Sequence, residues 1–409
     1  MKLLHTSDWH LGHKLINQER RKEHQHALDW LLETLLTEQI DILIIAGDVF
    51  DTANPPNYAL RQYYQFLAAA AETQCQQIII IGGNHDSPAL LEAAQPVLEK
   101  QCIQVVGCSA RQADGEVDFK RQVFPVTDKQ DKLIAVIGAM PYLRDRDLKY
   151  AKAGESATER EQSLRQGIHQ HYAAICQAMH EHGHSVPHIA TGHLFAAGAL
   201  TSDSEQAIHV GNLGQVGADC FPAQLDYVAL GHLHRTQRIA KQDRLRYCGA
   251  LIPLGFAEAE NRSQVLIAEF DGAQLTVVRE IEVPRTRRLL RLQGDLEQVL
   301  QLINDFPPLA STEFPAWLEI TLNQSEAMAE QQLSACCQTQ NLHILKLLVQ
   351  QNAETALTAI APGLDDLQPL DVFLKKCEDS AKTAEETAQL QDLFQILHTQ
   401  VLEAESDRQ

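Results

Sequence analysis

The sequence predicts a layered α/β fold that continues into a small α+β unit and ends in a helical segment. Short runs of β-prone apolar residues alternate with helix-period segments over most of the chain, a pattern typical of sheets covered by helices. Five of these runs end in a small residue followed by a side chain that can bind metal, namely LLHTSD, ILIIAGD, IIIIGGN, HIATGH and YVALGH. At 409 residues the chain is too long for one ordinary core, so we expect two or three domains.

The elements follow a simple order along the chain. Helices are predicted near residues 22–37, 57–73, 88–99 and 158–182, and β runs follow near 237–248 and 263–283. Pro284 marks the end of this part. From Arg288 to about Leu348 the pattern is strand, helix, strand, helix, strand, and after Asn352 the chain closes with helices. We therefore expect domains at 1–284, 285–351 and 352–409.

The five strand ends supply seven side chains that can bind metal: Asp8, His10, Asp48, Asn84, His193, His232 and His234. Ligands of α/β sheets gather outside the carboxyl ends of the strands, so one shared site is expected. Seven groups are too many for one ion that keeps a position open for water, which indicates two ions. Carboxylate, imidazole and amide oxygen without thiolate suit Mn²⁺ or Fe²⁺. Because two-metal sites are the usual clamp for displacement at phosphorus, the predicted chemistry is phosphoester hydrolysis.

Each motif alone also has a structural explanation. Asp8-Trp9-His10 and Gly231-His232-Leu233-His234 could be turns at strand ends. Asp51 could stabilise a turn beside Asn54-Pro55-Pro56, and we favour that structural role for it. The repetition of such motifs after five separate strands favours the shared site.

His85 and Asp86 are the candidate catalytic residues outside the ligand set. His85 follows the ligand Asn84 directly, so it is held near the site, and imidazole titrates near neutral pH as a general acid should. Asp86 could orient the His85 ring. It could equally serve the entry to a helix, because Ser87-Pro88 resembles an N-cap followed by Pro at the first helical position.

The ordered motifs resemble those of the calcineurin-like metallophosphoesterases and, within them, those of the SbcD family, the nuclease subunit of the bacterial SbcC and SbcD complex. The stretches that carry the resemblance lie between residues 5 and 256: HTSDWHLG, AGDVFDT, GNHDS, ATGHL, and ALGHLHR with RYCGALIPLGF. The resemblance implies a metallophosphoesterase sandwich with a capping domain. It also implies a metal-dependent DNA nuclease, a double-strand exonuclease and single-strand or hairpin endonuclease that acts in recombination, replication and repair.

The resemblance further assigns roles to single residues. It implies that Asp8, His10, Asp48 and His234 bind one manganese ion and that Asp48, Asn84, His193 and His232 bind the other, so that Asp48 bridges. His85 would act on the phosphate without binding metal. Relatives from archaea and eukaryotes carry a second active-site His where this chain has Asp51, so no role of that His is carried over.

The partners expected are DNA, an SbcC-like coiled-coil ATPase and a second copy of the chain. The sequence contains no GxxxxGK[ST] loop, so ATP hydrolysis must come from a partner. An apolar stripe near the end has the spacing of one helix face and is expected to dock on the ATPase: Leu390, Leu393, Phe394, Leu397 and Val401. It could instead fold back on the capping unit. The family implies a homodimer, and a heterotetramer with the ATPase.

The dimer would form through the helices near 57–73 and 88–99, which are more apolar than one core-facing stripe requires. The side chains in question are Tyr63, Phe66, Leu67, Leu90, Leu91, Val97 and Leu98. Simple burial within the monomer is the alternative explanation for each of them.

Composition narrows the class of protein. Nine cysteines without a C-x-x-C pair do not form a disulfide or zinc framework, and there is no run of 18 apolar residues. Asp8 lies so close to Met1 that a cleaved signal peptide would remove the site, so we expect a cytoplasmic protein that does not bind membranes. A net charge of −20 weakens a DNA-binding interpretation. Arg20-Arg21-Lys22 and the arginines at 285, 287, 288 and 291 are basic clusters that could be ordinary solvated faces.

Two other hypotheses remain open at this point. The same metal site could belong to a metallophosphoesterase that acts on small molecules or phosphoproteins. The chain could also be a binding scaffold that kept the fold without the chemistry, which the complete set of ligands disfavours.

Overall fold

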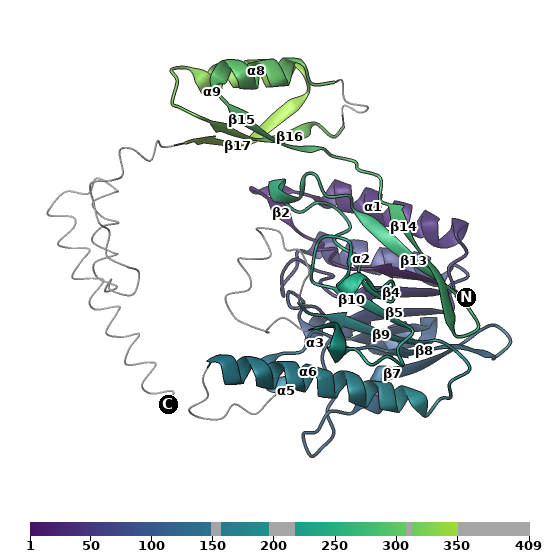
Figure 1. The fold of residues 1–409 in the computed structure, drawn as a ribbon. Coiled ribbons are helices and arrows are strands. Elements are labelled where there is room, and N and C mark those ends of the chain that lie inside the picture. Colours follow the sequence, from purple (N-terminus) through teal and green to yellow (C-terminus); the bar gives the residue numbers. More distant parts are fainter. Residues whose placement is uncertain (149–156, 196–216, 308–312, 351–409) are drawn as a thin grey trace. The chain divides into compact units, whose positions relative to one another are not determined.

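The structure, a computed structural model, describes residues 1–148, 157–195, 217–307 and 313–350 (Figure 1). The predicted region 352–409, with the apolar stripe from Leu390 to Val401, lies outside the described residues. The chain divides into two units, residues 1–349 and 350–409. None of the described helices has the length and apolar character needed to cross a membrane.

The first sheet has six strands in the order β14-β13-β1-β4-β5-β6. Its parallel half contains β1 (Lys2–Thr6), β4 (Ile42–Ala46), β5 (Gln77–Ile81) and β6 (Ile103–Val106). β13 (Gln264–Asp271) and β14 (Gln274–Glu282) extend the sheet antiparallel from β1. The small pair β2 (Lys14–Leu15) and β3 (Gln18–Glu19) forms a separate two-stranded ribbon.

The second sheet also has six strands, in the order β11-β12-β10-β9-β8-β7. β8 (Leu133–Gly138), β9 (His188–His193), β10 (Tyr227–Gly231) and β12 (Leu245–Tyr247) are parallel. β7 (Val123–Thr127) and β11 (Gln237–Arg238) close the two edges antiparallel.

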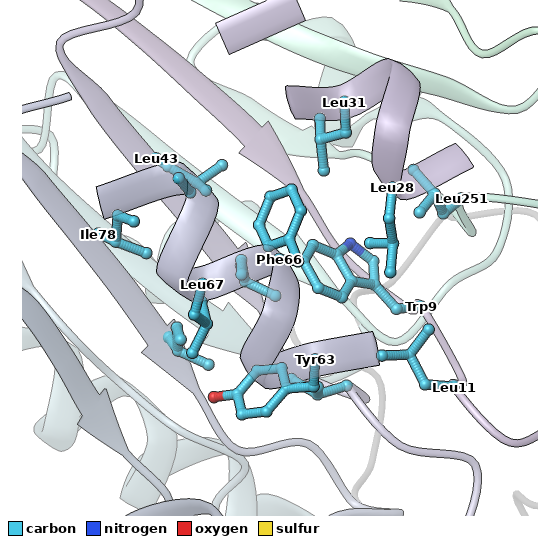
Figure 2. Close-up of a cluster of buried hydrophobic side chains, with 14 of the residues drawn as sticks. Trp9, Leu11, Leu28, Leu31, Leu43, Tyr63, Phe66, Leu67, Ile78 and Leu251 are labelled. Atoms are coloured by element: carbon cyan, nitrogen blue, oxygen red, sulfur yellow. The ribbon is translucent and has the colours of Figure 1, made fainter. Parts of the chain in front are cut away.

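Three apolar cores hold these sheets in layers, and the predicted α/β class is confirmed. α1 (Arg21–Thr37) and α2 (Asn57–Ala71) pack on one face of the first sheet, where Trp9, Tyr63 and Phe66 contribute large buried side chains (Figure 2). α6 (Ala157–His180) packs on the second sheet. A third core lies between the sheets and contains Ile44, Ile79, Ile137 and Ile189. The order of layers is therefore helix, sheet, sheet, helix (Figure 1).

The helix predicted at 88–99 is broken into two short pieces. α3 (Pro88–Glu92) begins after the N-cap Ser87 with Pro in the first turn, as predicted, although the Ser87 side chain makes no cap hydrogen bond. α4 (Gln95–Leu98) starts anew with Pro96 in its first turn. Proline lacks the N–H that a continuous helix would need at this position, which explains the break. The short α5 (Asp145–Leu148) precedes α6.

The small unit predicted from Arg288 has the expected order of elements. It contains β15 (Leu289–Gly294), α8 (Leu296–Asn304), β16 (Ala316–Leu322), α9 (Ala329–Thr339) and β17 (Leu342–Val349). The three strands are all parallel, because each helix returns the chain to the same end of the sheet. Asp295 and Gln298 form a capping box that fixes the start of α8.

Candidate metal centre

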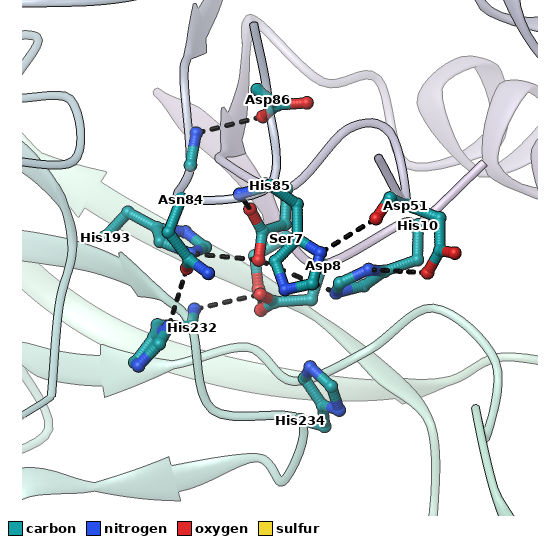
Figure 3. A network of polar contacts seen from close by, with 12 residues as sticks. Ser7, Asp8, His10, Asp51, Asn84, His85, Asp86, His193, His232 and His234 are labelled. Atoms are coloured by element: carbon teal, nitrogen blue, oxygen red, sulfur yellow. Dashed lines mark hydrogen bonds and ion pairs between the residues drawn. The ribbon is translucent and has the colours of Figure 1, made fainter. Parts of the chain in front are cut away.

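The seven predicted ligands lie together at the carboxyl ends of five strands (Figure 3). In the first sheet, β1 leads to Asp8 and His10, β4 leads to Asp48, and β5 leads to Asn84. β9 and β10 of the second sheet supply His193, His232 and His234. Each sheet therefore contributes about half of the site, and the site exists only where the two sheets meet.

The backbone at these strand ends adopts conformations that L residues rarely use. Asp8, His10, Asp48 and His232 all have positive φ, at 51°, 47°, 47° and 98°. Such strained residues cluster at functional sites, because the surrounding structure must hold them. Gly83 allows the close approach, since a Cβ at this position would lie 2.1 Å from Asp48 Oδ1. The strands thus turn sharply and aim successive side chains at one point.

One group of ligands comprises Asp8, His10 and His234, whose ligand atoms lie within 4.8 Å of one another. The Asp8 carboxylate is held by the His232 backbone N–H at 2.9 Å and the Ser7 hydroxyl at 2.5 Å. His234 Nδ1 lies 2.8 Å from Glu258 Oε1. Because the carboxylate accepts, Nδ1 carries the proton and Nε2 is left for metal, the arrangement that orients metal-binding histidines in many proteins.

A second group comprises Asp48, His193 and His232, again within 4.8 Å of one another. Asn84 Oδ1 lies 3.0 Å from both His193 Nε2 and His232 Nδ1. Asp48 Oδ2 lies 3.2 Å from His193 Nε2 and 3.6 Å from His10 Nε2, so its carboxylate stands between the two groups. His193 Nδ1 donates to the Ala46 carbonyl at 2.9 Å, which leaves Nε2 for metal.

The chemistry of the donors fits divalent cations. Among the described residues, His10 Nε2 is buried and has no hydrogen-bond partner, although such a nitrogen normally needs one. Burial alone would lower the pKa of His193, but the nearby Asp48 carboxylate outweighs it and raises that pKa to about 9. For Asp8, by contrast, burial itself raises the pKa. The buried Asp8 and Asp48 carboxylates need positive charge nearby, which the proton on His193 supplies without metal and which divalent ions would supply when bound.

His85 forms a further group with His10 and Asp48, whose ligand atoms lie within 4.8 Å of one another, and its ring is anchored by Asp51. Its backbone N–H donates to Asp48 Oδ1 at 2.9 Å, and its Nδ1 donates to the Asp51 backbone carbonyl at 2.8 Å. The ring also packs edge-on against His10, with centroids 4.9 Å apart. Since Nδ1 is committed to the carbonyl, Nε2 is the nitrogen of His85 that can exchange a proton with a substrate.

Asp86 does not orient the His85 ring, which corrects one of its two expected roles. Its buried carboxylate accepts the backbone N–H groups of Val49, Phe50 and Gly83 at 3.1, 2.9 and 2.9 Å. It therefore ties the loop after β4 to the loop after β5 and holds the ligand loops together. These three bonds go to the loops and none of them goes to α3, so neither expected role describes what this carboxylate does.

Asp51 does more than stabilise a turn, because it also contacts side chains of the site. Its Oδ1 lies 3.3 Å from His10 Nδ1, so the carboxylate faces the back of a ligand ring while the carbonyl faces His85. Burial alone would raise the pKa of Asp51, but the neighbouring His10 and His13 rings outweigh it and lower that pKa. Asp51 thus contacts two site histidines at once.

Glu258 was not predicted from the sequence, because it lies 24 residues beyond the last ligand, His234. Its side chain is only 1 % exposed, and besides His234 it accepts the Leu254 backbone N–H at 2.8 Å. A carboxylate in an otherwise apolar stretch, IPLGFAEA, was the available signal.

Two of the arginines in the predicted basic clusters are not on solvated faces. Arg20 is 1 % exposed and donates to Glu23 Oε1 at 2.9 Å and to the Pro253 carbonyl at 3.0 Å. Arg287 donates to the same Glu23 oxygen at 2.7 Å and stacks over Trp317, with its guanidinium carbon 4.1 Å from the ring centre. Both are structural, so neither is free to contact a polyanion.

Comparison with known proteins agrees with this geometry. Residues 1–236 match the family model of the calcineurin-like phosphoesterases, and residues 285–381 match that of the type 5 capsule protein repressor C-terminal domain. The chain is 36% identical over 412 residues to the SbcD subunit of nuclease SbcCD from Escherichia coli K12, which covers 98% of both chains. It is 34% identical to the protein of that name from Rhodobacter capsulatus, over 89% of this chain and 91% of the relative. The Bacillus subtilis protein of that name is 29% identical, and the match covers 87% of this chain and 88% of the relative.

The fold, the ligand geometry and these matches define a phosphoesterase that binds divalent metal. The chain belongs to the calcineurin-like phosphoesterases and, within them, to the SbcD family. The resemblance inferred from the sequence is thereby confirmed.

Proposed function

We propose that this chain is a DNA nuclease that hydrolyses phosphodiester bonds with the help of two divalent cations, most suitably Mn²⁺. The observation that carries the proposal is the pair of ligand groups on either side of Asp48, with His85 beside them. The relatives, each named as a subunit of the nuclease SbcCD, support DNA as the substrate over nearly the whole length of the chain.

The division of labour follows from the positions of the ligands. Asp8, His10 and His234 would hold one cation, and Asn84, His193 and His232 the other, with Asp48 shared. The cations, when bound, lower the pKa of a water molecule and neutralise charge on the phosphate. The chain supplies the orientation: Glu258 fixes the His234 ring, the Ala46 carbonyl fixes the His193 ring, and Asp86 holds the two loops that carry Asp48 and Asn84.

His85 would stabilise and protonate the leaving oxygen. Its Nδ1 is fixed by the Asp51 carbonyl, so proton transfer would occur at Nε2. Because His85 is anchored through its own backbone N–H to Asp48, the ring keeps its position relative to the ligands.

A comparison of variants tests the role of His85. His85→Gln should retain Mn²⁺ binding and lose most hydrolysis, because the residue adjoins a ligand without being one. Asp48→Asn should weaken the binding of both ions. Metal titration by calorimetry distinguishes them. If His85→Gln loses an ion as Asp48→Asn does, the role proposed for His85 is wrong.

A second experiment tests the substrate. The purified chain with Mn²⁺ is offered a linear DNA duplex, a DNA hairpin and p-nitrophenyl phosphate. Cutting of duplex ends and hairpins supports the nuclease that acts in recombination, replication and repair. Turnover of the small ester alone would instead favour a phosphatase for small molecules or phosphoproteins, and no turnover with bound metal would favour a scaffold.

We also propose that an SbcC-like ATPase is the partner and that it binds the region from Leu390 to Val401. Support comes from the apolar stripe in the sequence and from the relatives, each named as one subunit of a complex. Deleting residues 383–409 should spare Mn²⁺-dependent cutting of short single strands and abolish ATPase binding and ATP stimulation. A truncated chain that still co-purifies with the ATPase would contradict this.

We propose that the chain forms a homodimer through the surface near α2, α3 and α4, and that this dimer forms a heterotetramer with the ATPase. Five of the seven apolar side chains considered for it are buried in the monomer: Tyr63, Phe66, Leu67, Leu91 and Leu98. Val97 is 65 % exposed and Leu90 is partly exposed, so these two are the side chains left for a partner. Sedimentation that gives a concentration-independent monomer at micromolar protein would count against the dimer.

A further inference from the structure

Three histidines form a second cluster away from the candidate metal centre. His180 ends α6, His184 lies in the loop that follows, and His188 begins β9 (elements labelled in Figure 1). One ligand nitrogen from each ring lies within 4.8 Å of those of the other two. The ring centroids are 4.5 Å apart for His180 and His184, 5.2 Å for His180 and His188, and 5.7 Å for His184 and His188.

The backbone is shaped to bring the rings together. Gly183 has a φ of +96°, a left-handed conformation that glycine adopts without strain, and it turns the chain directly after the helix. The Gly183 N–H donates to the His180 carbonyl at 3.1 Å. At the other end of the loop, the His188 N–H donates to Asp226 Oδ2 at 2.8 Å, which fixes the start of β9. The histidines therefore sit on two anchored elements and the tight loop between them.

His188 already has the orientation of a metal ligand. Its Nε2 lies 2.7 Å from the Gly183 carbonyl oxygen, which can only accept, so Nε2 carries the proton. Nδ1 then presents its lone pair, as in metal-binding histidines whose other nitrogen donates to a carbonyl. Burial lowers the pKa of His188, which keeps the ring neutral, the form that binds metal. Cys176, one helical turn before His180, places its Sγ 3.7 Å from His180 Nε2 but does not belong to the cluster.

We propose that His180, His184 and His188 bind a Zn²⁺ ion, separate from the ions of the metal centre. Imidazole donors without a carboxylate suit zinc and its neighbours better than Mn²⁺. Two nitrogens about 2 Å from a tetrahedral ion lie about 3.3 Å apart. The three ring nitrogens lie within 4.8 Å of one another, so side-chain shifts of up to about 1.5 Å would close the site. The ion would join the end of α6 to the start of β9.

The two sites are distinct because β9 separates them. His188 is its first residue and His193, a ligand of the metal centre, is its last. At about 3.3 Å per residue these positions are about 16 Å apart. Zinc at the cluster would therefore act on the stability of this segment and would not take part in hydrolysis.

The experiment compares three full-length variants. Each is dialysed against low micromolar Zn²⁺ with excess Mn²⁺, and bound zinc is measured by mass spectrometry of the metals. His184→Ala should bind one zinc per chain less than the unchanged protein. His182→Ala removes an exposed histidine of the same loop that lies outside the cluster, and it should keep that zinc. Asp48→Asn, altered only at the metal centre, should also keep it.

Two further measurements support the comparison. Zinc should raise the Tm of the unchanged protein and of His182→Ala by a few degrees and leave that of His184→Ala unchanged. Mn²⁺-dependent hydrolysis without zinc should be equal in the unchanged protein, His182→Ala and His184→Ala. Equal zinc content in His184→Ala and the unchanged protein, or loss of the zinc in Asp48→Asn, would overturn the proposal.

Discussion

Replacing Asp86 with Asn tests how the ligand loops are held. The carboxylate accepts three buried backbone N–H groups, two of them from the residues that follow Asp48 and one from Gly83. The amide keeps the size of the side chain but turns one accepting oxygen into a donor, which faces N–H groups that it cannot satisfy. Hydrogen bonds to a charged acceptor contribute about 1.5–3 kcal/mol each, so losing one or two should lower the free energy of unfolding by about 1.5–6 kcal/mol.

Metal affinity should fall with the stability. Loss of the supporting contacts of a ligand typically weakens metal binding about 10- to 100-fold, and Asp86 supports the loops of Asp48 and Asn84 together. At saturating Mn²⁺ the turnover number should stay within a few-fold of the original, with an unchanged pH profile, because Asp86 does not contact His85. Urea unfolding, calorimetric Mn²⁺ titration and phosphodiester hydrolysis across pH measure the three quantities.

Asp41→Asn is the matched control. Asp41 lies just before β4, at the opposite end of the strand from Asp48, and its Oδ2 accepts the Lys2 backbone N–H at 2.7 Å. This variant should lose some stability and keep its full Mn²⁺ affinity. A large drop in turnover by Asp86→Asn, with stability and metal binding intact, would refute the structural role and restore a catalytic one through His85.

Two further predictions concern buried groups near the centre. Glu258→Gln should weaken the binding of one Mn²⁺ about 10- to 100-fold, because a neutral amide replaces the carboxylate that accepts the His234 Nδ1–H. A calorimetric titration in which both ions bind as before would exclude this. Burial, aided by the Arg20 cation, lowers the pKa of His24 to about 3. Below about pH 6.5 the His24 side chain takes up a proton in the unfolded chain but not in the folded chain. The free energy of unfolding therefore decreases as the pH falls toward 3, by about 3 kcal/mol between pH 7 and pH 4. His24→Leu should reduce that loss. Urea unfolding of both proteins at pH 7 and pH 4 measures it, and an equal loss in the two proteins would contradict the prediction.

The clustering of the seven candidate ligands could be predicted from the sequence because they lie at or just after the ends of five strands. Asp8, Asp48 and Asn84 come within three residues of the end of a buried apolar run, and strand ends of an α/β fold converge. Strand order is not needed for this inference. For the same reason the sequence could not show that the ligands come from two sheets rather than one.

The supporting residues could not be predicted in this way, because their roles depend on long-range packing. Glu258 reaches His234 from a separate turn, and Asp86 makes its bonds to backbone groups that carry no sequence signature. Arg287 pairs with Glu23 across 264 residues of sequence, so a local cluster of arginines gave no sign that this one is buried. The break between α3 and α4 was visible as Pro96, but the apolar positions on both sides suggested a single helix.

The division of the ligands between two sheets links metal binding to the folding of the whole domain. Asp48 follows the first sheet and His193 ends the second, and their side chains approach to 3.2 Å. What fixes this distance is the core between the sheets, where Ile44 and Ile189 lie on the strands that carry these ligands. Close-packed cores transmit small displacements, so a shift of one sheet would separate the ligand groups. An ion held by both sheets, as we propose, would bind only the folded state and stabilise it, and it would give the domain a link that neither sheet could provide alone.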